Sequence, residues 1–134
     1  MSRELADRER RFLAGLPVVR EYATSVGRAL LCHGLGLDDM AGLKPDDDPR
    51  DNASLVALRA AAYYRLVIAG HTHRRMVRQV GGLTIVNPGT LYRKHEPGFA
   101  RIDLAAGEVA FFDLVERRGH IEAHPAARVP LMTS

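Results

Sequence analysis

The chain has 134 residues and a formal net charge of +3 from 19 basic and 16 acidic residues, so it is expected to form one domain or part of one. A hydrophobic share of 46% supports a packed core, whereas an aromatic share of 6% without tryptophan argues against a stacking platform for nucleic acid. No apolar run reaches the length of a membrane span, and the N-terminus has no hydrophobic signal region. The single Cys32 fits a reducing compartment. Together these features favour a cytoplasmic protein with no membrane partner and no specific nucleic-acid partner.

The beginning of the chain predicts a surface helix followed by a hairpin-like pair of strands. Charged residues surround a thin apolar stripe in residues 2–14, with Ser2 as a candidate N-cap and Gly15 as the stop. Apolar and β-branched residues then predict strands over 18–23 and 29–32.

A strand-helix-strand unit follows. The strand at 29–32 leads into an acidic irregular stretch at 35–52. An amphipathic helix over 53–64 follows, with Asn52 as its candidate N-cap, and then an apolar strand over 66–69. This order and length predict a parallel crossover unit, because parallel strands need a long connection. The carboxyl ends of both strands therefore lie on the same edge of the sheet, where open α/β sheets bind ligands.

Histidines follow both of these strands. His33 comes directly after the first, and the second ends in Gly70-His71-Thr72-His73. In extended backbone the residues at i and i+2 face the same side, so His71 and His73 are expected to point into one pocket together with His33. Neutral imidazole is a good ligand for transition metals, and the pattern predicts a metal site at this edge.

The rest of the chain predicts antiparallel hairpins. Residues 76–80 and 83–86 surround a Gly-Gly turn, and residues 99–104 and 109–115 form a second alternating pair. From residue 116 onward no core pattern is visible, and we expect a frayed tail. Two further predictions concern histidines outside the site. His95 is expected at the surface in a polar loop, and His120 and His124 are not expected to bind a metal ion.

Three motifs of this chain resemble the second half of a calcineurin-like metallophosphoesterase: Leu31-Cys32-His33-Gly34, Gly70-His71-Thr72-His73 and Asn87-Pro88-Gly89-Thr90. The resemblance covers residues 16–114 and is strongest to the small bacterial and archaeal phosphodiesterase branch of that superfamily. It implies an α/β (α+β) fold, namely the C-terminal half of a β-sandwich flanked by helices. The implied partial domain is residues 1–115, with residues 116–134 as a tail.

The resemblance also implies a centre of two divalent transition metal ions (Mn, Fe, Zn or Ni). His33 and His71 would bind one ion and His73 the other. In the intact family site such ions activate a hydroxide that hydrolyses a phosphodiester or phosphomonoester bond.

Other residues would support this site. Gly34, Gly70 and Asn87 would hold the histidine loops in place. Arg74 and Arg75 would contact the phosphate-ester substrate, since guanidinium suits phosphate oxygens, or would remain solvated surface charges.

The sequence departs from the family pattern before His33. Asp-x-His, Gly-Asp and Gly-Asn motifs, which carry the other ligands in family members, are not found, so the bridging carboxylate is absent. Asp38 and Asp39 are expected to be solvated rather than to replace it. Three histidines alone are able to hold one ion, as three-histidine zinc sites do.

Two functions therefore stay open. The chain is a metal-dependent phosphoesterase that needs carboxylates from elsewhere, or it is a non-catalytic truncated module or subunit that binds metal or a partner chain. Because the missing half of the sheet would leave an edge and an apolar face uncovered, we expect a partner chain or self-association to supply that half.

Overall fold

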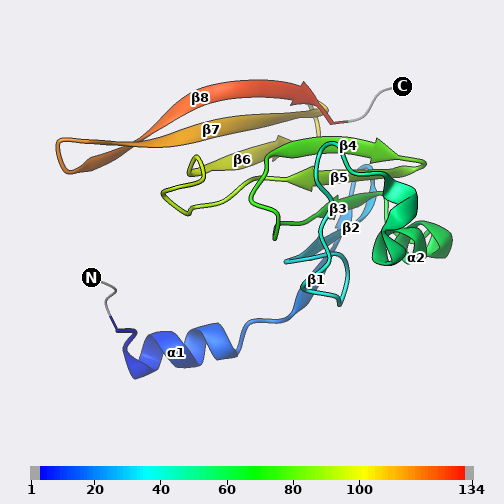
Figure 1. Ribbon diagram of the computed structural model, residues 1–134, viewed down its shortest axis with the longest axis horizontal. Helices are drawn as coiled ribbons and strands as arrows, with labels where there is room; N and C mark the ends of the chain where they lie inside the picture. Colours follow the sequence, from blue (N-terminus) through cyan, green and yellow to red (C-terminus); the bar gives the residue numbers. More distant parts are fainter. Residues whose placement is uncertain (1–3, 132–134) are drawn as a thin grey trace.

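The computed structural model describes residues 4–131, which form a mixed α/β arrangement with two sheets (Figure 1). Along the chain, the elements are α1 (Asp7–Ala14), β1 (Val19–Thr24), β2 (Gly27–Cys32), a 3₁₀ helix (Pro49–Asp51), α2 (Ala53–Ala61), β3 (Leu66–Ile68), β4 (Met76–Val80), β5 (Leu83–Asn87), β6 (Gly98–Asp103), β7 (Glu108–Arg117) and β8 (His120–Pro130). Neither helix of this described part is long and apolar enough to cross a membrane.

The larger sheet has the strand order β1-β2-β3-β5-β4. Its three central strands are parallel, with Ala29 opposite Leu66 and Leu66 opposite Thr84, whereas β1 and β4 pair antiparallel at the edges. The predicted crossover is confirmed, because α2 connects the parallel neighbours β2 and β3. The hairpin predicted over residues 76–80 and 83–86 is confirmed as well, since β4 and β5 pair antiparallel and Val80 lies opposite Leu83 beside the turn.

This sheet is buried on both faces at its centre. On one face Val67 and Ile85 pack with Leu55 of α2. On the other face Leu66 and Val86 pack against the smaller sheet, which has the order β6-β7-β8. All of β5 is buried, as expected of a central strand. The burial of each of its large aliphatic side chains, Leu83, Ile85 and Val86, contributes about 1.5–3 kcal/mol to stability.

Local capping sets the limits of α2. The side chain of Asn52 accepts a hydrogen bond from the backbone of Leu55 at 3.0 Å, which confirms the predicted N-cap. The helix ends at Ala61 rather than at the predicted Tyr64, because Ala62 adopts the left-handed conformation with φ 54°. The chain therefore leaves the helix earlier than the apolar spacing suggested, whereas β3 begins at Leu66 as predicted.

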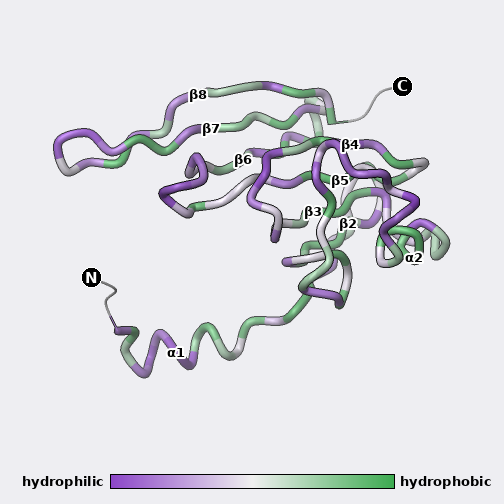
Figure 2. The backbone as a smooth tube through the Cα atoms, in the orientation of Figure 1, coloured by the Kyte–Doolittle hydropathy of each residue, from purple (hydrophilic) through white to green (hydrophobic). Residues whose placement is uncertain are grey.

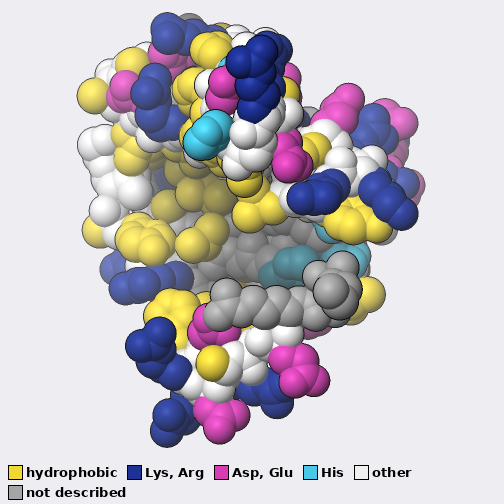
Figure 3. Space-filling view, turned by 90° about the vertical axis from the view of Figure 1, so that its left-hand side faces the viewer, with side chains coloured by type: hydrophobic (Ala, Val, Ile, Leu, Met, Phe, Trp, Pro, Cys, Tyr) yellow, Lys and Arg dark blue, Asp and Glu magenta, His cyan; other side chains and the backbone are white. Residues whose placement is uncertain are grey.

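Helix α1 begins at Asp7, later than predicted, and ends at Ala14 with Gly15 as the C-cap, as predicted. Ser2 lies outside the described residues. Helix α1 buries no side chain and projects from the sheets, and Figure 2 shows hydrophilic residues along most of it and hydrophobic residues towards its C-terminal end. Figure 3 shows hydrophobic side chains gathered in the hollow between this helix and the sheets.

The prediction of a frayed tail from Glu116 is wrong. Strand β7 continues to Arg117, past the predicted boundary at residue 115, and β8 pairs with it antiparallel from His120 to Pro130. Backbone hydrogen bonds between strands do not require an apolar side-chain pattern, so no pattern in these residues indicates the strand. The buried Leu131 then anchors the end of β8, with its N–H donating to Gly107 O at 2.8 Å.

Candidate metal centre

The candidate site lies where the parallel strands β2, β3 and β5 end. Two backbone hydrogen bonds hold the strand ends together: Gly70 N–H donates to His33 O at 2.8 Å, and Ala69 N–H donates to Val86 O at 2.9 Å. Because these bonds continue the sheet pairing beyond the strands, the loops that follow β2 and β3 leave the sheet side by side.

His33 and His71 meet at this edge, as the crossover predicts. His71 Nδ1 lies 3.3 Å from His33 Nε2, and the two rings are nearly perpendicular with centroids 5.3 Å apart. These residues are 38 positions apart in the sequence, so their contact is a product of the parallel pairing alone.

His73 makes a different contact. Its Nδ1 lies 2.9 Å from Nδ1 of His95, which is exposed in a loop as predicted. The ring of Tyr92 packs edge-on against His95, with centroids 4.9 Å apart. The structure thus divides the site histidines into two pairs, and within residues 4–131 no group of three or more His, Cys, Asp or Glu side chains is arranged to hold one ion.

The loop between β3 and β4 has an unusual backbone. His71 and His73 both adopt positive φ, 69° and 64°, although neither is glycine. Such a conformation costs of order 1–2 kcal/mol per residue and persists only where the surroundings enforce it. Strain of this kind is concentrated at functional sites.

Asn87, at the end of β5, enforces this conformation. Its buried side chain donates to Gly70 O at 3.2 Å and to Thr72 Oγ1 at 3.0 Å, and it accepts from Gly89 N–H at 2.9 Å. The Asn87 amide therefore fixes the histidine loop and the following turn with one set of contacts.

Two glycines let the loop after β2 approach closely. A methyl group at Gly34 would collide with backbone atoms of Asp38, Asp39 and Ala41. A Cβ at Gly42 would lie 2.7 Å from Thr72 Cγ2 and 3.2 Å from His71 Cδ2, so this glycine packs directly beneath the site. The role of Gly42 has no sequence signal, because its neighbours come from a loop 30 residues away.

The two arginines of the histidine loop lie in different surroundings. Arg74 is exposed and forms a loose ion pair with Asp46 at 3.7 Å. Arg75 is only 20% exposed and forms a salt bridge of 2.6 Å with Asp113 of β7. It also donates to Phe112 O at 3.3 Å, so Arg75 joins the histidine loop to the smaller sheet, and Arg74 is the guanidinium that faces solvent.

Other polar groups near the site are committed elsewhere. The Asp38 carboxylate accepts from Met40 N–H at 3.1 Å in its own loop and from the Ser54 hydroxyl of α2 at 3.3 Å. Cys32 is buried, and burial raises the pKa of its thiol, which keeps it protonated near neutral pH. Neither group is presented to the imidazoles.

The spacing of His33 and His71 fits a metal ion. Zinc bound to two imidazole nitrogens at about 2.0–2.1 Å, with a tetrahedral angle between them, separates those nitrogens by about 3.3 Å. The distance between His71 Nδ1 and His33 Nε2 is 3.3 Å. This separation is compatible with two imidazole ligands of one tetrahedral ion, and it is also that of a hydrogen bond between the two rings.

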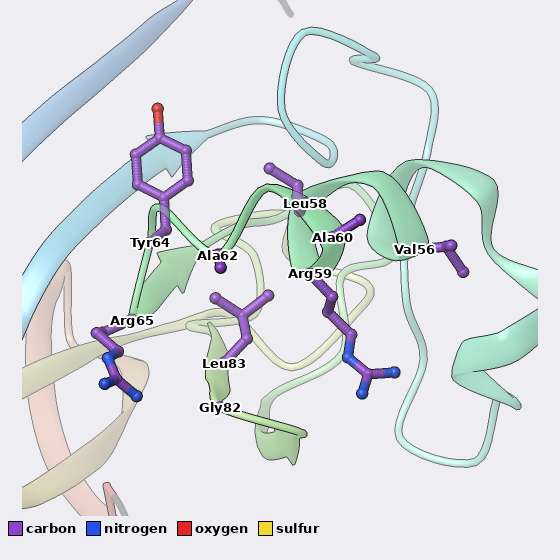
Figure 4. Close-up of a pocket in the computed structure, with 9 residues that line it drawn as sticks. All are labelled: Val56, Leu58, Arg59, Ala60, Ala62, Tyr64, Arg65, Gly82 and Leu83. Carbon is purple, nitrogen blue, oxygen red and sulfur yellow. The ribbon is translucent and has the colours of Figure 1, made fainter.

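A cavity of about 510 Å³ at the opposite end of the sheet is separate from these histidines. It lies between α2 and the β4–β5 turn, and Figure 4 shows Arg59 and Arg65 on either side of Leu83. Arg65 precedes β3, so this cavity belongs to the amino ends of the parallel strands and forms no part of the candidate site.

Comparison with known proteins identifies the family. Residues 5–107 match the model of the calcineurin-like phosphoesterase superfamily domain, which is most of the chain. No curated protein matches.

Solved structures show the same fold. A hypothetical protein from Pyrococcus horikoshii is 19% identical with a TM-score of 0.63, and the match covers 79% of this chain and 43% of that one. A variant of Vps29 from Entamoeba histolytica is 22% identical with a TM-score of 0.52, covering 87% and 62% of the two chains. Wild-type Vps29 from the same organism, in complex with Zn²⁺, is 21% identical with a TM-score of 0.48, covering 88% and 63%. The chain thus spans about half to two thirds of the length of these structures.

Proposed function

Because the chain belongs to the calcineurin-like phosphoesterase superfamily, we propose that it forms part of a metal-dependent phosphoesterase that hydrolyses a phosphodiester or phosphomonoester bond. The observation that carries the proposal is the 3.3 Å separation of His71 Nδ1 and His33 Nε2 at the carboxyl edge of the parallel strands. That separation matches what a shared transition metal ion requires.

Each residue has a distinct task in this proposal. His33 and His71 hold one divalent ion (Mn, Fe, Zn or Ni), and His73 contributes to a second. When bound, such an ion acts as a Lewis acid on phosphoryl oxygens and lowers the pKa of a coordinated water. Arg74, exposed beside the imidazoles, attracts the anionic substrate, while Arg75 keeps the loop attached to the smaller sheet.

We further propose that this chain corresponds to the C-terminal half of the family domain and acts in the cytoplasm. The solved structures it matches are longer, and the resemblance places additional carboxylate ligands in the part that precedes His33. Those carboxylates would come from another polypeptide segment or chain. The fully buried Asn87 and the strained histidine loop are consistent with a site that is already shaped for its ligands.

The test compares His71→Ala with His120→Ala, a control on the exposed hairpin of the smaller sheet. Both proteins are purified without chelator, and metal content and hydrolysis of an aryl phosphodiester are measured. We expect His71→Ala to lose the ion shared with His33 and at least 100-fold of any hydrolysis, while the control retains both. Unchanged metal content and activity in His71→Ala would contradict the assignment.

A second candidate function is that of a self-associating, non-catalytic module, as the edge of the larger sheet suggests. Strand β1 is exposed over most of its length and has an unpaired edge. Phe12 of α1 is 67% exposed and Val18 before β1 is 70% exposed. Apolar groups beside an open strand edge favour pairing with another chain, here a second copy.

Light scattering during size-exclusion chromatography tests this candidate over a range of protein concentrations. We expect the wild-type mass to rise towards that of a dimer and the Val18→Lys variant to stay a monomer. A wild-type mass that stays monomeric throughout, together with hydrolytic activity, would favour the enzyme over the module.

A further inference from the structure

The connection between β5 and β6 brings an additional histidine to the site. His95 lies in this connection, and its Nδ1 is 2.9 Å from Nδ1 of His73. The rings have their centroids 5.2 Å apart, and Tyr92 lies beside both of them. The family motifs identified in the sequence do not include His95.

Several hydrogen bonds fix the connection that carries His95. His95 N–H donates to Tyr92 O at 3.0 Å, and Tyr92 N–H donates to the Thr90 hydroxyl at 3.0 Å. At the end of the connection, Gly98 N–H donates to Thr90 O at 2.9 Å. These bonds close the segment into a compact turn, so the His95 ring is presented to His73 by an ordered backbone.

The spacing of this pair suits a metal ion with a smaller ligand angle. Two nitrogens at about 2.0–2.1 Å from an ion are separated by about 2.9 Å where they subtend a right angle, as in five- or six-coordinate geometry, and by about 3.3 Å in tetrahedral geometry. The two Nδ1 atoms are 2.9 Å apart. A cavity of about 530 Å³, lined among others by Thr72, Arg74 and Glu96, borders the pair and leaves room for water or a phosphate group as the remaining ligands.

We propose that His95 is a metal ligand and that it holds a divalent transition metal ion together with His73. The two pairs then define two separate ions, one between His33 and His71 and one between His73 and His95. Each ion receives two imidazoles from this chain and completes its coordination with other groups. The catalytic meaning of the second ion rests on the proposed function, whereas its binding does not.

Zinc titration of the full chain tests the proposal after removal of bound metal with a chelator. Calorimetry and elemental analysis give the stoichiometry of wild type, His95→Ala, His33→Ala and the control His120→Ala. Cobalt(II) absorption provides a second readout of imidazole coordination that does not depend on activity. Thermal unfolding of the metal-free proteins confirms that each variant is folded, and His95→Gln repeats the test with a side chain that still hydrogen-bonds.

We expect two ions in wild type and His120→Ala, and one in His95→Ala, His95→Gln and His33→Ala, with the affinity of the lost site reduced at least 10-fold. The proposal is overturned if His95→Ala and His95→Gln bind as wild type does, because the pair is then only a hydrogen bond. Loss of an ion in His95→Ala but not in His33→Ala would support the second ion and contradict the His33–His71 site of the proposed function. Absence of zinc binding in wild type would overturn both.

Discussion

The two imidazole pairs of the site are positioned by different parts of the fold. His33 and His71 follow β2 and β3, and their loops are joined by the 2.8 Å bond from Gly70 N–H to His33 O. His95 instead comes from the connection between β5 and β6, whose ends are held by short-range hydrogen bonds and by Arg75. The first pair is therefore a consequence of sheet pairing, and the second is a consequence of loop structure.

This difference indicates for which pair the arrangement of the imidazoles depends on the stability of the whole domain. The ends of β2 and β3 cannot separate without loss of the buried core, so the first pair is preorganised as long as the protein is folded. The second pair includes an exposed loop, whose local opening costs less free energy. We expect the first pair to bind metal more tightly, and the following variants test that expectation.

The largest effect is expected for Asn87→Ala, which acts on both pairs. The variant removes the hydrogen bonds to Gly70 O, Thr72 Oγ1 and Gly89 N, and leaves buried polar groups unsatisfied. Each such group costs about 1–3 kcal/mol, and we expect a loss of about 3 kcal/mol of unfolding free energy and weaker binding at both sites.

Urea denaturation and zinc titration measure these two quantities. Asp103→Ala is the control, since it removes the hydrogen bond that Ala106 N–H donates to Asp103 Oδ1 in the β6–β7 turn and should cost about 1 kcal/mol without weakening zinc binding. Equal losses of unfolding free energy and of zinc affinity in the two variants would show that Asn87 is no more than an ordinary loop cap.

Gly42→Ala should separate the pairs. The added methyl group would lie 2.7 Å from Thr72 Cγ2 and 3.2 Å from His71 Cδ2, so the His71 ring must move. We expect zinc affinity at the His33–His71 site to fall about 10-fold, and the His73–His95 site to change less. Gly15→Ala, which meets nothing closer than 3.4 Å, is the control, and calorimetry of both proteins would reveal whether the ring position matters.

Tyr92→Ala should have the smallest effect and the opposite selectivity. The Tyr92 ring packs edge-on against His95 with centroids 4.9 Å apart, and such contacts contribute about 0.5–1.5 kcal/mol. We expect zinc affinity at the His73–His95 site to fall about two- to tenfold while the other site is unchanged. Tyr63→Ala removes an edge-on contact with Tyr64 of the same length, far along the chain from the site, and should leave the zinc isotherm as in wild type.

Much of the larger sheet was predictable from local sequence. Apolar runs bounded by glycine and histidine gave β2 and β3, Asn52 marked the start of α2, and the Gly81-Gly82 turn marked the β4–β5 hairpin. The contact between His33 and His71 followed from the predicted crossover, because neighbouring parallel strands end at the same edge of the sheet. These features depend on residues close in sequence or on general topology.

The β7–β8 hairpin was not predictable in this way. Strand β8 contains mostly exposed side chains, and it pairs with β7 through its backbone along its whole length. A strand without alternating apolar residues resembles a polar tail in the sequence. Only the pairing itself distinguishes the two.

The sequence by itself determined the strand order around the crossover, the start of α2, and the presence of histidines at the edge of the sheet. Only the tertiary structure decided that His73 turns away from the other two histidines: His71 lies beside His33, as the crossover rule predicts, whereas His73 turns to His95. The physical reason is the positive φ of His71 and His73, 69° and 64°. The rule that i and i+2 face the same side holds for extended backbone, and here the contacts of Asn87 hold the loop out of that conformation.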